Sequence, residues 1–147
     1  MKIGICCDHA GYELKELIKP ILESRPDVDE VIDFGTHSAE SCDYPDFAHP
    51  CAAALEKGEV YPAIGICGSG NGIAMTLNKH QGVRAAICWT PELARLARQH
   101  NDANCLVLSA RFISTETAID VLNAFLATPF DGGRHERRVN KIPLRNE

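Results

Sequence analysis

Short apolar runs alternate with longer amphipathic stretches along the whole chain. The apolar runs have the length of buried strands, and the stretches between them repeat their apolar residues at helical spacing. In 12–24, one helical face would collect Leu14, Leu17, Ile18, Ile21 and Leu22. The pattern predicts strands at 2–7, 30–34, 63–67, 83–88 and 105–109. It predicts helices at 12–24, 45–57, 73–78, 91–99 and 115–126, and a basic segment at 132–145 that is helical as far as the neighbourhood of Pro143.

Some residues mark where these helices begin or end. Thr90 can cap a helix that has Pro91 in its first turn, and Ser114 or Thr115 can begin the helix at 115–126. Pro20 lies inside the first helical pattern, so we expect a kink or a break in that helix.

The alternation of strands and helices predicts one α/β domain over residues 1–147. Its five-stranded parallel sheet would be covered by helices on both faces. Ligands of such open sheets bind beyond the carboxyl ends of the strands. This rule directs attention to the residues that follow the strands, at 7–9, 34–36, 67–72, 88–89 and 109–111.

Composition narrows the class of protein. A net charge of -5 disfavours nucleic-acid binding, which needs many cations against the phosphates. Seven cysteines without a CxxC pair disfavour a disulfide framework or a zinc ribbon and favour reduced thiols. The N-terminus lacks a signal-peptide pattern, and no apolar run is long enough to cross a membrane. We therefore expect a cytoplasmic protein without a membrane partner.

A glycine-rich turn follows the third expected strand. Gly68, Gly70 and Gly72 alternate with Ser69 and Asn71 between the strand and the next helix. Such a turn can aim several backbone N–H groups at one anion, either a phosphate or an oxyanion that forms during a reaction. The alternative is a tight strand-to-helix turn. The spacing fits neither a dinucleotide-binding fingerprint nor a phosphate-binding P-loop.

Cys67 lies immediately before that turn. A thiol beside a helix N-terminus can become a thiolate near neutral pH and act as a general base or a nucleophile. The alternative is an inert, buried cysteine, which is equally common.

Two polar groups are further candidates for chemistry. Asp8 and His9 follow the first strand and suit proton transfer or phosphate contact, although Asp8 could simply cap a helix. His100, Asn101 and Asp102 suit recognition of sugar hydroxyls, or form a polar turn.

The C-terminal segment is basic in an otherwise acidic chain. Arg134, Arg138 and Lys141 would share one helical face, and Arg111 follows the fifth strand. Arginine side chains match phosphate oxygens, so in an acidic protein this cluster favours a small phosphorylated ligand over a long polyanion. The alternative is a solvated helix face, the usual place of such charge runs. We expect these cations, Cys67 and the other polar groups to meet at one edge of the sheet.

The ordered motifs resemble the ribose-5-phosphate isomerase B family, which includes the related galactose-6-phosphate isomerase subunits. The resemblance spans nearly the whole chain, and its motifs are 7–11, 43–45, 67–73, 78–79, 98–104, 133–135 and 138–139. It implies a Rossmann-like three-layer α/β fold with a basic C-terminal helix, and a homodimer or a dimer of dimers whose active site lies at the subunit interface. It also implies an isomerase without metal or other cofactor. Because Cys67 is present and Ile73 follows the loop, the chain resembles the branch that uses a cysteine base.

The same resemblance implies a role for each candidate residue in isomerising ribose 5-phosphate and ribulose 5-phosphate. Cys67 would move a proton between C2 and C1, and His100 would open the sugar ring with help from Asp8 or Ser69. The N–H groups of the loop would stabilise the enediolate, with substrate contacts from Gly68, Gly70, Asn71 and Gly72. Phosphate would be held by His9, Arg111, Arg134 and Arg138, and the sugar by Asp8, Tyr44, Asn101 and Asn78.

Three alternatives remain open at this point. A six-carbon sugar phosphate, allose 6-phosphate or galactose 6-phosphate, would use the same chemistry in a roomier site. A non-catalytic phosphosugar-binding module would keep the fold without turnover. A flavodoxin-like redox domain is disfavoured, because the glycine turn follows the third strand and Trp89 is the single tryptophan.

Overall fold

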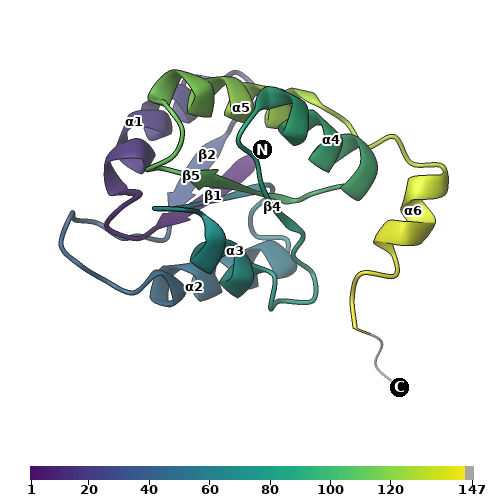
Figure 1. The fold of residues 1–147 in the computed structure, drawn as a ribbon, viewed down its shortest axis with the longest axis horizontal. Coiled ribbons are helices and arrows are strands. Elements are labelled where there is room, and N and C mark those ends of the chain that lie inside the picture. Colours follow the sequence, from purple (N-terminus) through teal and green to yellow (C-terminus); the bar gives the residue numbers. More distant parts are fainter. Residues whose placement is uncertain (145–147) are drawn as a thin grey trace.

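All five expected strands form, and they pair in parallel in the order β2-β1-β3-β5-β4 (Figure 1). The computed structural model describes residues 1–144. The strands are β1 Lys2–Cys7, β2 Glu30–Asp33, β3 Ala63–Cys67, β4 Ala85–Ile87 and β5 Cys105–Ser109. Strand β4 is shorter than expected and lies at the edge of the sheet. Just before it, the Arg84 N–H donates to the side chain of Asn104 at 2.7 Å, so for this N–H a side chain takes the place of a backbone acceptor.

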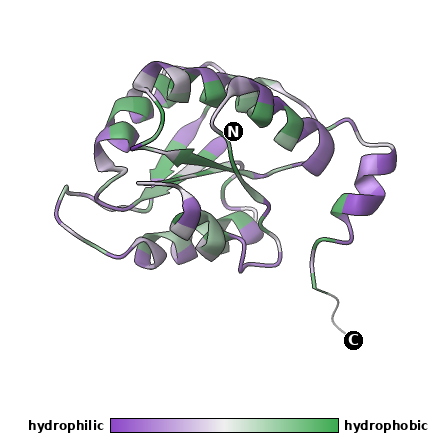
Figure 2. Cartoon of the chain, viewed as in Figure 1, coloured by the Kyte–Doolittle hydropathy of each residue, from purple (hydrophilic) through white to green (hydrophobic). Residues whose placement is uncertain are grey.

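Helices cover both faces of the sheet, as the alternating pattern predicted. They are α1 Tyr12–Glu23, α2 Tyr44–Glu56, α3 Asn71–Leu77, α4 Pro91–Asn101, α5 Thr115–Ala127 and α6 Arg134–Val139. Helices α1, α4 and α5 lie on one face, and α2 and α3 lie on the other (Figure 1). Each face has its own apolar core, and α6 is mostly hydrophilic (Figure 2).

Two of the expected helix starts are confirmed. The Thr90 hydroxyl accepts from the Leu93 N–H at 3.2 Å, and the Ser114 hydroxyl accepts from the Thr117 N–H at 3.1 Å. Of the kink or break expected at Pro20, the break is wrong, because α1 continues past this residue to Glu23.

The basic C-terminal helix is shorter than expected. Helix α6 ends at Val139, its one buried residue, and turns follow as far as 142. Arg145, where the expected basic segment ended, lies outside the described residues. None of the helices described in residues 1–144 has the length and hydrophobicity needed to cross a membrane.

The connections between strands decide which loops share an edge. A helix that joins two parallel strands runs back across the sheet, so its last residues lie at the amino ends of the strands. The loop from β2 to α2 therefore lies at the carboxyl edge, at the left of Figure 1, whereas the end of α4 and all of α6 lie toward the opposite edge, at the right.

Candidate active site

Asp8 and Cys67 lie side by side at the ends of the central strands β1 and β3. The Asp8 N–H donates to the Ile66 carbonyl at 3.2 Å, which ties the residue after β1 to β3. The two residues are only 7% and 5% exposed. Helix α1 leaves β1 on one face of the sheet, and α3 leaves β3 on the other (Figure 1). This is the switch point at which open α/β sheets bind ligands.

Asp8 organises the turn that leads into α1. One of its carboxylate oxygens accepts from the N–H groups of Ala10 at 2.9 Å and Gly11 at 3.1 Å. These contacts lie in the turn before α1, whose N-cap is Gly11 and has no side-chain cap, so the alternative of a helix cap by Asp8 is wrong. The role of Asp8 in ring opening stays a prediction.

The glycine loop leaves several backbone donors without a partner. Gly70 has φ +85°, and a Cβ there would lie 2.9 Å from the Ser109 hydroxyl, so only glycine fits. The Asn71 N–H donates to the Ser69 hydroxyl at 3.1 Å, so this predicted substrate donor is already engaged. The N–H groups of Gly68, Ser69 and Gly70 have no hydrogen-bond partner in residues 1–144. Such a group of donors can bind an anion.

Two of the predicted substrate-binding side chains touch this loop. Tyr44 begins α2 and lies over Gly72, where a Cβ would come within 2.7 Å of the phenol oxygen. The Arg111 guanidinium lies over Gly68, with Nη1 3.3 Å from the position of a Cβ. The Arg111 N–H also donates to the Gly68 carbonyl at 3.0 Å. An aromatic ring and a cation therefore flank the unpaired donors.

His9 has a fixed tautomer when neutral. Its Nδ1 accepts from the Cys42 N–H at 3.2 Å. The proton of the neutral ring therefore lies on Nε2, which can donate to a phosphate. The partner comes from the loop between β2 and α2, so the position of that loop controls the orientation of His9.

That loop is held by a buried ion pair that sequence reasoning missed. Lys15 is fully buried, and its Nζ donates to both carboxylate oxygens of Asp33, at 2.8 and 2.7 Å, and to the Thr36 carbonyl at 2.6 Å. Burial opposes ionisation of Asp33, but hydrogen bonds from Lys15, the Gly35 N–H and Lys19 outweigh it and lower its pKa. A signal was present, because Lys15 shares a helical face with Ile18 and Leu22.

Burial changes the acidity of four other cysteine thiols. It raises the pKa of Cys7 and of Cys88 to about 12, and it raises that of Cys105 well above the usual value. The pKa of Cys6 is also raised, by a hydrogen bond with Cys51 and by burial. These four thiols are protonated near neutral pH and cannot serve as a base there. Cys67 itself borders the core on the α2 and α3 side.

The other predicted site residues lie at the amino ends of the strands. The expectation that all of the site residues meet at one edge of the sheet is therefore wrong. His100 and Asn101 end α4, and Arg134 and Arg138 lie on α6, which packs against α4. The reason is the direction of α4: its last turn lies at the amino ends of the strands, away from Cys67. Within one chain the candidate residues therefore form two groups. The carboxyl-edge group consists of Asp8, His9, Tyr44, Arg111 and the loop 67–72, and the amino-edge group consists of His100, Asn101, Arg134 and Arg138.

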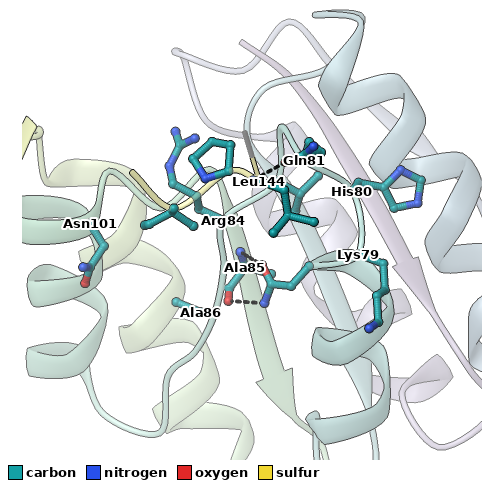
Figure 3. Close-up of a pocket in the computed structure, with 12 residues that line it drawn as sticks. Lys79, His80, Gln81, Arg84, Ala85, Ala86, Asn101 and Leu144 are labelled. Atoms are coloured by element: carbon teal, nitrogen blue, oxygen red, sulfur yellow. Dashed lines mark hydrogen bonds between the residues drawn. The ribbon is translucent and has the colours of Figure 1, made fainter. Parts of the chain in front are cut away.

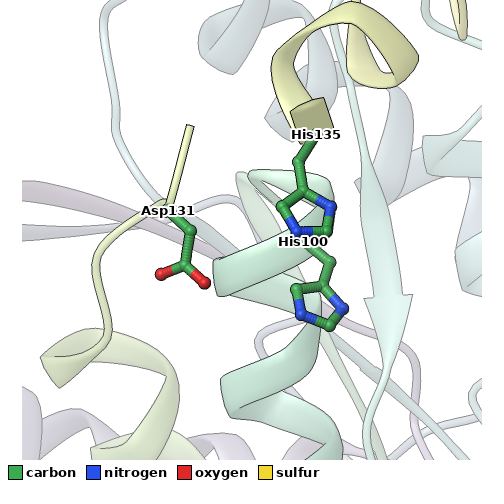
Figure 4. Close-up of side chains that lie close together, drawn as sticks. All are labelled: His100, Asp131 and His135. Atoms are coloured by element: carbon green, nitrogen blue, oxygen red, sulfur yellow. The ribbon is translucent and has the colours of Figure 1, made fainter. Parts of the chain in front are cut away.

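The amino-edge group contains a pair of stacked imidazoles. The rings of His100 and His135 have centroids 4.3 Å apart and planes 10° apart, with Asp131 beside them (Figure 4). Desolvation and the neighbouring His100, Arg134 and Arg138 lower the pKa of His135. His100, Asp131 and His135 each offer a ligand atom within 4.8 Å of the others. However, lone pairs in two nearly parallel rings do not converge on one ion, so the geometry favours stacking over metal ligation.

A groove of about 570 Å³ also lies at the amino edge (Figure 3). Its lining includes Asn101, Arg84 and residues 142–144. Asn78 was expected to contact the sugar, but its side-chain amide instead pairs with the backbone of Ala85, at 3.0 Å to the carbonyl and 2.8 Å from the N–H. Both polar atoms of Asn78 therefore hold β4 in place.

Comparison with known proteins places this architecture in a family. The model of the family described as Ribose/Galactose Isomerase matches residues 3–142. This chain belongs to that family. Ribose-5-phosphate isomerase B of Escherichia coli (strain K12) is 45% identical over 142 residues, which cover 96% of this chain and 93% of that protein. The Ribose/Galactose Isomerase model and this relative confirm the resemblance seen in the sequence motifs.

Two solved structures extend the agreement to the fold. Ribose-5-phosphate isomerase B of Clostridium thermocellum has a TM-score of 0.94 at 49% identity, and the match covers 97% of this chain and 95% of that one. The enzyme of Mycoplasma genitalium, solved with bound ribulose 5-phosphate, has a TM-score of 0.91 at 40% identity, with coverages of 96% and 93%. The predicted α/β fold is confirmed. The roles of individual site residues stay predictions.

Proposed function

We propose that this chain is a ribose-5-phosphate isomerase, which interconverts ribose 5-phosphate and ribulose 5-phosphate. One observation carries the proposal: at the switch point of the sheet, the Cys67 thiol adjoins a loop whose N–H donors have no partner among residues 1–144. A proton next to a carbonyl is removed most easily where a base and oxyanion donors meet. The relative solved with ribulose 5-phosphate supports the choice of sugar.

The proton transfer uses the carboxyl-edge group. As a thiolate, Cys67 removes the C2 proton of the open-chain aldose, and the electrons move onto the C1 oxygen to form an enediolate. The proton of the C2 hydroxyl moves to the C1 oxygen, and the thiol returns its proton to C1, which leaves a hydroxyl at C1 and a carbonyl at C2. The N–H groups of Gly68, Ser69 and Gly70 stabilise the enediolate oxygens. One donor of this kind is worth about 3 kcal/mol when it is removed singly.

Ring opening and phosphate binding draw on both groups. His100 acts as the acid or base for ring opening, helped by Asp8 or Ser69. The Ser69 hydroxyl accepts from Asn71, so its own hydrogen can be donated. The phosphate is held by two residues of each group: His9, Arg111, Arg134 and Arg138.

We further propose that the active site forms between two copies of the chain. The carboxyl-edge group of one copy would meet the amino-edge group of the other, which gives a symmetric homodimer with two sites. The separation of Cys67 from His100 across the sheet supports this arrangement, because a single chain cannot bring them into one cleft. A dimer of dimers would use the same paired sites.

Mixed dimers test the shared site. Cys67→Ala and His100→Ala are each expected to be inactive, and their co-expression should restore about a quarter of the wild-type specific activity, because half of the dimers are mixed and each has one intact site. Co-expression of Cys67→Ala with Asp8→Ala is the matched control and should restore nothing, since both changes affect the same group. Absence of recovery for the first pair would show that the two groups do not form a shared site.

Turnover of ribose 5-phosphate in the presence of EDTA tests the reaction and its independence of metal together. We expect product from the purified chain at an undiminished rate. The family description also names galactose, so galactose 6-phosphate and allose 6-phosphate belong in the same assay. Exclusive turnover of a six-carbon substrate would replace the proposed sugar. Saturable binding without turnover would identify a phosphosugar-binding module instead.

The proposed reaction belongs to the pentose phosphate pathway in the cytoplasm. All seven cysteines are free thiols in the structure, which supports a reducing compartment.

A further inference from the structure

A chain of two hydrogen bonds joins the single tryptophan to the glycine loop. Trp89 Nε1 lies 2.9 Å from the Ser109 hydroxyl oxygen, and that oxygen lies 2.5 Å from the Ser69 carbonyl. An indole N–H can only donate, and a hydroxyl has one hydrogen. Ser109 therefore accepts from Trp89 and must donate to Ser69, so the direction of both bonds is fixed.

This direction determines where a loop donor points. The peptide bond between Ser69 and Gly70 is trans, so the Gly70 N–H points opposite to the Ser69 carbonyl. Because the carbonyl is held by Ser109 at the end of β5, the N–H is turned away from β5 and has no partner in residues 1–144. The close approach of Ser109 to Gly70 keeps the loop against the sheet.

Burial alone does not explain the position of Trp89. Its side chain is 51% exposed, and it stacks on Phe112, which is 63% exposed, with planes 3° apart and centroids 6.1 Å apart. About half of this large ring stays in water, so its apolar area is only partly buried. Its polar atom instead reaches Ser109, which is fully buried.

We propose that Ser109 and Trp89 are positioning residues that aim the Gly70 N–H at the enediolate, and that Trp89 fluorescence therefore reports occupancy of the loop. The inference rests on the proposed isomerase function. A donor held in place before reaction stabilises charge that develops only in the transition state, so its loss lowers kcat more than it raises KM. Neither residue needs to touch the substrate.

Kinetics of two variants test the proposal with ribose 5-phosphate. Ser109→Ala removes the bond to the Ser69 carbonyl and should lower kcat about tenfold, with KM changed less than about twofold, because a loop donor is misdirected rather than deleted. Trp89→Phe leaves Ser109 able to donate and should lower kcat about threefold. Phe112→Leu is the matched control, since it removes the stacked ring but no hydrogen bond, and its kcat should equal that of the wild type.

Fluorescence gives a second measurement. If Ser109 had only a structural role, the change in Trp89 emission on binding would be the same in Ser109→Ala as in the wild type. Saturating ribose 5-phosphate should change the emission of Trp89 in the wild type, and Ser109→Ala should still bind but lose this response. Wild-type kcat in a folded Ser109→Ala variant, or an unaltered response there, would overturn the proposal. If Ser109→Ala fails to fold, the kcat of Trp89→Phe decides instead. A kcat for Trp89→Phe equal to that of Phe112→Leu overturns the proposal. Failure of the proposed function looks different, because the wild type itself would show no turnover.

Discussion

The two edges of the sheet hold different parts of the candidate site, and they differ in how firmly those parts are fixed. At the carboxyl edge, Asp8 and Cys67 are nearly buried, and hydrogen bonds fix Asp8 and the glycine loop beside it. At the amino edge, Arg134 and Arg138 are exposed, and His100 is held by its stack on His135 (Figure 4).

This difference indicates which step of the proposed reaction each edge of the sheet suits. Buried polar groups must be hydrogen-bonded, and this requirement fixes the carboxyl-edge group before any ligand arrives. Exposed arginines keep their rotamer freedom until something binds them. Proton transfer and oxyanion stabilisation need prearranged groups, whereas capture of a phosphate tolerates mobile ones. The predictions below test this contrast, beginning with the largest expected effect.

Cys67→Ala should remove the chemical step and leave binding intact. Loss of a general base lowers kcat by about 10² to 10⁴-fold, while the phosphate contacts stay in place. Steady-state kinetics and calorimetric titration with ribose 5-phosphate measure the two effects separately. Cys42→Ala is the control, because that residue contacts His9 through its backbone N–H and not through its thiol. Full activity in Cys67→Ala would assign the base role to another group.

Lys15→Met should lower the stability of the protein more than a change at the neighbouring Lys19. It leaves Asp33 largely buried without its closest partner, which costs about 3 to 5 kcal/mol in the free energy of unfolding. Urea unfolding measures this cost. Lys19→Met is the matched control, because Lys19 also contacts Asp33, at 3.0 Å, but is partly exposed, so its loss should cost at most about 1 kcal/mol. Equal losses in the free energy of unfolding for the two variants would show that burial of Lys15 does not strengthen its ion pair with Asp33.

Arg138→Ala should weaken substrate capture with little effect on the chemical step. We expect KM to rise about tenfold, which corresponds to about 1.4 kcal/mol, with kcat nearly unchanged. Arg137→Ala is the control, since adjacent residues of a helix do not share a face, so Arg137 lies on a different side of α6 from Arg138. A large fall in kcat for Arg138→Ala would place this arginine in the fixed part of the site instead. Unchanged KM and kcat would make it a solvated surface residue.

Much of the fold followed from local patterns in the sequence. Strands β1, β3 and β5 have the expected bounds, because buried central strands read as unbroken apolar runs. The edge strand β4 and the short helix α6 were overestimated, since their ends depend on contacts such as that of Asn104 with Arg84. Lys15 was missed because a lysine in a helix is ordinarily solvated, and only the position of Asp33 in space shows that its charge is paired.

The sequence by itself determined the fold class, the family motifs and the chemical types of the site residues, because periodicity, glycine placement and residue identity are local properties. It also placed Asp8, Cys67 and Arg111 after strands, and hence at the carboxyl edge. Only the tertiary structure decided that Tyr44 joins them there while His100, Arg134 and Arg138 lie at the other edge. The physical reason is that distance through space depends on the direction in which each helix recrosses the sheet and on the buried hydrogen bonds that fix each loop.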